Sequence, residues 1–332
     1  MGRLPGLVET IERVRVPAPV TSLGLIGLLV AVFVLLNIGA NPATEEGKDF
    51  IKSVPWIAWR AIGAAAVVVF VLLLIVASRV LLTRASQCLR APWPWVVGYL
   101  ALAAVLVGLI IAGIVVGGGR NPDLPVPYLP YRTRVVLFSG LVVAVPWLAI
   151  AWLCRDECRP PDRRLWGPTM ELEYLDLQRL WRTIYLCIGA FAVGVVAALV
   201  TAGALRFAFL SIAKECGSDR LPVGRRSAGL RCTEDFPATD VLLYGAAFAL
   251  ILLMVAMPLI VAWRAQALAW VRRQEPLPRA AVPTEEWTQE SSRLRDLLGL
   301  NTPLLRDPLT LLSVFAPIIT STLAAFLPEL GT

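Results

Sequence analysis

Cysteine is the residue type whose spacing in this sequence most clearly suggests chemistry. Cys216 and Cys232 bracket a polar, arginine-rich loop, which the distribution of basic residues directs to the outer side of a membrane. Paired cysteines in an oxidising compartment usually form a bridge, and closing a loop of this length stabilises a fold by about 3 kcal/mol in the chain-entropy model. The sequence therefore predicts a Cys216–Cys232 disulfide. The alternative is two thiols, which applies if the loop lies in the cytoplasm.

The other four cysteines fall at the predicted cytoplasmic ends of apolar segments: Cys88, Cys154, Cys158 and Cys187. Four thiolates are a ligand set that zinc accepts. Here they would come from three different segments, and no C-x-x-C knuckle is present. We therefore expect these cysteines to be small, buried residues of the core and predict no metal site.

Two charged residues lie near apolar segments, Arg60 and Asp240, both towards the predicted outer end. Charge inside a membrane is costly and usually marks a functional path or a pair. One interpretation is an Arg60–Asp240 ion pair. The other is that Arg60 extends its guanidinium group to the interface while Asp240 caps its helix.

Several reaction classes are excluded by the residues that the sequence lacks. The chain contains no histidine, so no histidine acid, base, metal ligand or haem ligand exists. No lysine lies in an apolar segment, and no phosphate-binding G-x-x-x-x-G-K-[ST] loop occurs. We also find no paired carboxylates within the apolar segments. The sequence thus offers no catalytic residue and no cofactor site.

The elements that would position these residues are apolar helices. The sequence is 57% hydrophobic and 17% charged, with a mean hydropathy of +0.70. Its apolar runs cover about 20–36, 54–77, 95–116, 135–153, 184–205, 241–261 and 309–327. About 20 apolar residues in a helix cross a bilayer core of about 30 Å, and lipid leaves the backbone no other partner. We predict an all-α, polytopic transmembrane bundle over residues 1–332, forming a single integral membrane domain.

The number of spans is six or seven. The first run could be a signal peptide, although no clear cleavage site follows it, and we expect it to be retained as a span. The run at 309–327 contains Pro317 and has no cation at its far end, so it either spans the bilayer or forms a re-entrant helix.

Arginine and lysine set the expected orientation. With the N-terminus inside, the cytoplasmic segments hold 19 of these cations and the outer segments hold 12. We therefore predict a cytoplasmic N-terminus in a cell membrane, with the inner membrane of a bacterium as the expected location. The chain has a net charge of +7, and its basic residues flank the apolar runs. We therefore expect acidic lipid headgroups as the partner, and not nucleic acid.

Two cytoplasmic stretches, about 168–182 and 283–298, have helical patterns. Each begins with Pro-Thr followed by acidic residues, which is typical of a capped helix N-terminus. Each also carries an apolar stripe, which would pack on the bundle or lie at the membrane interface. The alternative is that the stripe is a docking face for a protein partner, a role that the basic outer loop could share.

Three classes of function remain open. We expect a membrane scaffold, sensor or assembly component without catalysis, because the outer loop and the cytoplasmic helices suit contacts on both sides. The first alternative is a transporter or channel component, whose pore could be lined by Ser139, Thr201, Ser313, Thr320 and Ser321. The second alternative is a membrane enzyme acting on a lipid or isoprenoid substrate.

Overall fold

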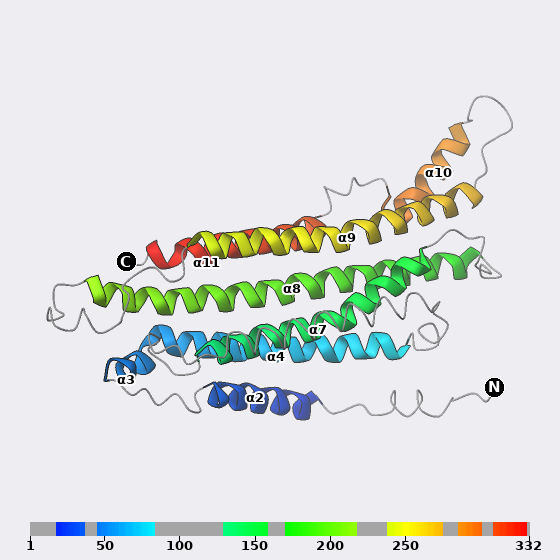
Figure 1. Ribbon diagram of the computed structural model, residues 1–332. Coiled ribbons are helices and arrows are strands. Elements are labelled where there is room, and N and C mark those ends of the chain that lie inside the picture. Colours follow the sequence, from blue (N-terminus) through cyan, green and yellow to red (C-terminus); the bar gives the residue numbers. More distant parts are fainter. Residues whose placement is uncertain are drawn as a thin grey trace. The chain divides into compact units, whose positions relative to one another are not determined.

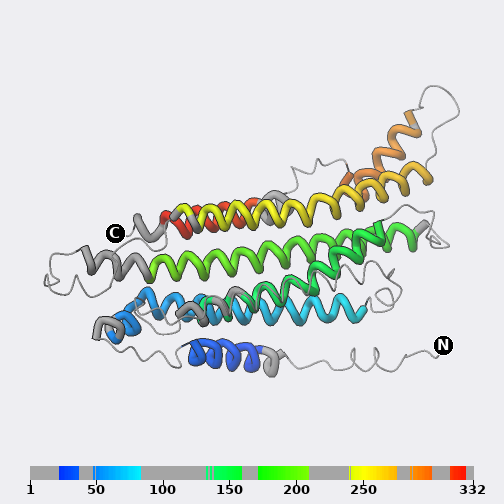
Figure 2. Tube along the Cα trace, in the orientation of Figure 1, coloured from blue at the N-terminus to red at the C-terminus, as the bar shows by residue number. Residues whose placement is uncertain are grey.

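The computed structural model describes residues 18–36, 45–83, 129–158, 170–217, 238–274, 285–300 and 308–330 (Figures 1 and 2). Every regular element in these ranges is an α-helix, which confirms the all-α prediction. The helices are α2 (Ala18–Leu35), α3 (Glu45–Lys52), α4 (Val54–Thr83), α7 (Leu129–Glu157), α8 (Met170–Gly217), α9 (Ala238–Gln274), α10 (Glu285–Leu297) and α11 (Pro308–Leu330). The predicted span at 95–116 lies outside the described residues.

Four of the described helices are long and apolar enough to cross a bilayer. Their apolar stretches are Val54–Thr83, Phe138–Glu157, Glu171–Ala208 and Val241–Gln274. Shorter apolar stretches occur in α2 (Ser22–Leu35) and in α11 (Phe315–Phe326). Large apolar side chains on these helices are exposed, for example Leu243 at 69%. Such a surface is favourable against lipid and unfavourable against water, which indicates a membrane-embedded protein.

The chain divides into two compact units. Unit 1 comprises Met1–Pro146, Val193–Ala246 and Ile318–Thr332, and unit 2 comprises Trp147–Ala192 and Ala247–Pro317. Helices α7, α8, α9 and α11 each contribute one part to each unit.

In unit 1, α4 packs between α2, α7 and α8, and Gly63 marks the common crossing. A Cβ atom placed at Gly63 would contact Leu36, directly after α2, at 3.5 Å, Val136 of α7 at 3.7 Å and Thr201 of α8 at 4.0 Å. Further along α4, Phe70 contacts Gly140 of α7. The later residue of α4 thus contacts the later residue of α7, so these two helices run parallel.

The last part of α11 packs tightly on the last part of α8, also within unit 1. A Cβ atom at Gly203 would lie 2.5 Å from the Cβ atom of Ala324, closer than two carbon atoms can approach. One residue further along α11, the carbonyl of Ala325 accepts a hydrogen bond of 2.5 Å from Nη1 of Arg206. This helix pair depends on a residue without a side chain at position 203.

In unit 2, the first part of α8 and the last part of α9 pack antiparallel through aromatic side chains. The rings of Trp181 and Trp263 stack with centroids 4.1 Å apart, and those of Tyr174 and Trp270 lie 6.1 Å apart. The indole Nε1–H of Trp263 donates to the carbonyl oxygen of Leu177 at 3.1 Å. The earlier residue of α8 contacts the later residue of α9, so the two helices run antiparallel.

The boundaries of α8 and α9 differ from those expected. The sequence predicts a separate cytoplasmic helix at 168–182 before a span at 184–205, whereas α8 is one helix of 48 residues. Polarity changes near Arg182, but no Gly or Pro interrupts the backbone there. Likewise α9 continues past the predicted end of its span at 261 to Gln274. A change of polarity marks the point where a helix leaves the apolar core. The helix itself ends only where the backbone can no longer continue it.

Candidate functional site

The most unusual feature of unit 1 is a set of buried arginine side chains. Arg60 is 7% exposed, Arg132 is 8% exposed and Arg206 is 2% exposed. Removing a guanidinium ion from water is costly unless polar groups or counter-charges replace its hydration. The groups around these arginines must therefore replace the water that a guanidinium ion loses on burial.

Arg60 lies on the face of α4 that points into unit 1, together with Trp56, Trp59 and Gly63. Its guanidinium carbon lies 4.6 Å from the ring centre of Phe33 in α2, in a cation–π contact. The Nε atom of Arg60 is buried and has no hydrogen-bond acceptor in the part of the chain that the structure describes. The Arg60 side chain is therefore buried within unit 1.

Arg132 approaches the same turn of α2 from α7. Its Nη1 donates a hydrogen bond of 2.6 Å to the carbonyl oxygen of Leu36, at the end of α2. The last carbonyl groups of a helix lack partners within the helix and carry partial negative charge, so a cation is favourable there. Burial, and then the nearby positive charge of Arg60, hold the pKa of Arg132 below its ordinary value. Phe33 and Leu36 are three residues apart, so the two guanidinium groups converge on one turn.

Two tryptophans complete this cluster. The rings of Trp56 and Trp59 stack with centroids 4.8 Å apart, and Phe50 of α3 contacts Trp56 at 5.3 Å. Both indoles are completely buried, and neither Nε1–H has an acceptor among the described residues. The first turns of α4 thus place several hydrogen-bond donors in an apolar environment.

The predicted ion pair and disulfide both involve residues that the structure does not describe in full. Asp240 lies in the first turn of α9, but its side chain is outside the described part, so the Arg60–Asp240 pair stays a prediction. Cys232 lies outside the described residues, and only the backbone of Cys216 is described, near the end of α8. No described cysteines lie at disulfide distance, so the structure gives the predicted bridge no support.

Three of the remaining cysteines lie in the core of unit 2. Cys154, Cys158 and Cys187 are all buried, and the thiol of Cys187 donates to the carbonyl oxygen of Trp147 at 3.4 Å. Within the described ranges, no three side chains of the metal-binding types gather in one place. Cys88, the fourth candidate, lies outside those ranges.

Three of the five hydroxyl groups that could line a pore donate hydrogen bonds to carbonyl groups of their own helices. Ser139 donates to the carbonyl of Val136, Thr201 to that of Ala197 and Ser321 to that of Ile318, at distances of 2.6, 2.8 and 2.9 Å. The side chain of Ser313 is not described. A hydroxyl group bonded in this way has already donated its proton to its own helix, so it has less capacity to coordinate a passing solute.

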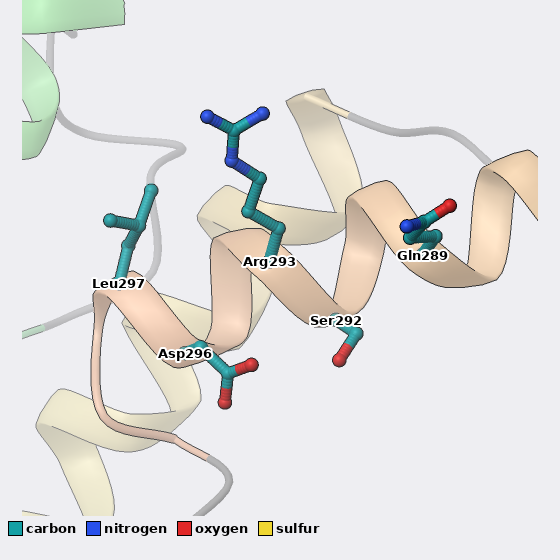
Figure 3. Close-up of a pocket in the computed structure, with 5 residues that line it drawn as sticks. All are labelled: Gln289, Ser292, Arg293, Asp296 and Leu297. Carbon is teal, nitrogen blue, oxygen red and sulfur yellow. The ribbon is translucent and has the colours of Figure 1, made fainter.

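A second candidate surface is the exposed face of α10 in unit 2. Gln289, Ser292, Arg293, Asp296 and Leu297 line a shallow, open depression on this helix (Figure 3). They occupy one helical face, since they are three or four residues apart. Ser291, Leu294 and Leu298 are buried on the opposite face. Helix α10 is thus anchored through one side and presents charged, polar and apolar groups on the other.

No family model, curated protein or solved structure matches this chain. The function is therefore inferred from the buried arginine cluster of unit 1 and the exposed face of α10 in unit 2. Sequence patterns alone identify Arg60 and the helix at 283–298, whereas Arg132, Arg206 and Gly203 become apparent only from their neighbours on other helices.

Proposed function

We propose that this protein is a membrane scaffold or assembly component without catalysis of its own, residing in the cell membrane with a cytoplasmic N-terminus and six or seven spans. The observation that carries this proposal is the aromatic extension formed by α8 and α9 in unit 2. It holds α10 and gives that helix a fixed surface for a partner.

The lengths of α8 and α9 support an extension beyond the membrane. The uncharged stretch 183–205 of α8 is roughly 34 Å long at about 1.5 Å per residue, enough for the hydrocarbon core. The preceding part of α8, from Met170 to Arg182, adds about 20 Å and carries acidic and basic residues. In α9 the uncharged stretch ends at Trp263, and the helix continues to Gln274.

The aromatic contacts support rigidity in this extension. Trp181 and Trp263 lie at the end of the uncharged stretches, where indole groups favour the headgroup level. Beyond them, the Trp263–Leu177 hydrogen bond and the Tyr174–Trp270 contact join the two helices. Buried aromatic pairs of this kind add about 0.5–1.5 kcal/mol beyond the area they bury.

The end of α10 is fixed to the same extension. Gly299 adopts a positive φ of 66°, and its N–H donates to the carbonyl of Asp296 while the N–H of Leu300 donates to that of Arg295. These paired bonds form a Schellman motif, which glycine permits at low cost. The carbonyl of Leu300 then accepts a hydrogen bond of 3.2 Å from Nη2 of Arg264 in α9. The chain is thus tied to α9 directly after α10.

The proposal is tested by the mass of the particle that contains this chain in native membranes. The chain alone is 36.1 kDa, and we expect it in a larger assembly when it is extracted with its surrounding lipid. The double substitution Arg293→Ala and Leu297→Ala should release the chain from that assembly, because it removes the charged and the apolar contact of the α10 face.

Arg295→Ala is the matched control. Arg295 is also exposed and lies on the same helix, but it is not part of the depression in Figure 3. This variant should keep the larger mass. A wild-type chain that always migrates alone, or an equal loss in both variants, would contradict the proposal.

A further inference from the structure

The outward face of α8 in unit 2 combines basic and apolar groups. Four residues of this face are spaced three or four positions apart along the helix: Arg179, Arg182, Leu186 and Gly189. Both arginines are exposed, and Leu186 is 44% exposed. Ile184, two residues after Arg182, lies on the opposite face and is completely buried. The basic and apolar groups therefore face away from the core of unit 2.

The two arginines lie at the level where α8 leaves the apolar region. The uncharged stretch of α8 begins directly after Arg182. Trp181 stacks on Trp263, which ends the uncharged stretch of α9, so the two helices leave the apolar region together. Tryptophan favours the headgroup level, since its ring is buried there while its N–H stays near water. The arginines therefore lie where lipid phosphates are found, and Leu186 and Gly189 lie where acyl chains begin.

Gly189 leaves open space on the apolar part of this face. None of the described residues comes within 4 Å of a Cβ atom placed there. A hydrocarbon chain can therefore lie directly against the backbone of α8, with the exposed Leu186 side chain beside it. A molecule that has both an anionic head and an acyl chain matches the two parts of the face.

The carboxylate of Asp176 shares this face with Arg179. Its Oδ1 lies 3.8 Å from Nη1 of Arg179, and the two side chains are 73% and 76% exposed. An ion pair with this exposure is weak. A guanidinium group has five N–H donors, so Arg179 can contact Asp176 and a phosphate oxygen at the same time. The pair therefore leaves Arg179 able to bind a second anion.

We infer that this outward face of α8 binds an acidic phospholipid. The phosphate lies between Arg179 and Arg182, and an acyl chain runs along Leu186 and Gly189. Two guanidinium groups one turn apart offer paired N–H donors to the oxygens of one phosphate. Basic residues near a bilayer surface favour anionic headgroups. The site is distinct from the α10 face, so it does not depend on the scaffold role.

The test is lipid binding to the full chain, purified in detergent and stripped of lipid. The probes are phosphatidylglycerol and phosphatidylcholine with identical acyl chains, and native mass spectrometry counts the lipids that stay bound. We expect phosphatidylglycerol to bind about tenfold more tightly, because its headgroup carries a net negative charge and that of phosphatidylcholine does not. Equal affinity for the two lipids would overturn the inference.

Two variants connect this preference to α8. In the double variant Arg179→Gln and Arg182→Gln, the affinity for phosphatidylglycerol should fall about tenfold, because two charged donors are removed. Gly189→Leu keeps both charges and should weaken the same binding, since the new side chain fills the space of the acyl chain. These residues lie on the outward face, so the substitutions leave the core of unit 2 unchanged.

The matched control is the double variant Arg272→Gln and Arg273→Gln. Both residues are exposed in the part of α9 beyond Trp263, and the control removes the same number of charges. It should bind phosphatidylglycerol as the wild type does. An equal loss in the control and in the α8 double variant would show that net charge, and not this face, attracts the lipid. Unchanged binding in the α8 double variant or in Gly189→Leu would also contradict the inference.

Discussion

At position 203 even a methyl group is too large. Helices α8 and α11 approach closely there, and an added Cβ atom would lie 2.5 Å from that of Ala324. We expect Gly203→Ala to lower the free energy of unfolding by about 1–3 kcal/mol, because the helices must separate to admit the methyl group. Thermal unfolding of the purified protein in detergent measures this change.

Gly189→Ala is the control for that substitution. Gly189 lies on the same helix, and nothing is within 4 Å of a Cβ atom placed there. The free energy of unfolding should stay unchanged or rise slightly, since alanine favours the helix more than glycine does. Equal destabilisation by the two substitutions would show that α8 and α11 do not approach at Gly203.

These residues also show what the sequence can predict at a single position. Arg60 stands out because its charge interrupts an apolar run, which is visible without any structure. Arg132 looks like an ordinary loop cation, and Gly203 is one of many small residues in its span. Their roles depend on Leu36 and Ala324, which lie far away in sequence and are brought near only by helix packing.

Among the elements, the extension of α8 and α9 depends most on Trp263. This residue is 2% exposed, stacks on Trp181 and donates to the Leu177 carbonyl. Trp263→Ala should lower the free energy of unfolding by about 3–5 kcal/mol, since it removes a large buried side chain. Amide hydrogen exchange should then increase in 170–182 and 264–274, because the contacts that hold these segments together are lost.

The control is Leu250→Ala on the same helix. Leu250 is 57% exposed on an apolar surface, so its truncation removes few contacts within the protein. Exchange in 170–182 and 264–274 should not change in this variant. If Trp263→Ala also leaves that exchange unchanged, the aromatic contacts do not hold the extension together.

Apolar patterning predicts the existence of these elements better than their ends. The run at 54–77 identifies a helix that begins at Val54, because Pro55 and the apolar residues after it give a clear start. The same reasoning wrongly divides α8 at Arg182, because a change of polarity does not end a helix. Helix continuity depends on the backbone, and the residues around Arg182 are all compatible with a helix.

For the whole molecule, the scaffold proposal depends on one topological claim. The end of α9 must lie in the cytoplasm, and the segment before α4 must lie outside. The excess of arginine in the predicted cytoplasmic segments supports this orientation. The reverse orientation would place α10 outside and the Arg60–Arg132 cluster near the cytoplasmic surface.

The most direct test is labelling of single introduced cysteines in intact cells with a membrane-impermeant thiol reagent. Lys52→Cys and Arg272→Cys are suitable because both side chains are exposed, and the parent chain measures background from its native cysteines. We predict labelling of Lys52→Cys in intact cells and labelling of Arg272→Cys only after the membrane is opened. Labelling of Arg272→Cys in intact cells, with Lys52→Cys protected, would contradict the topology and the cytoplasmic scaffold together.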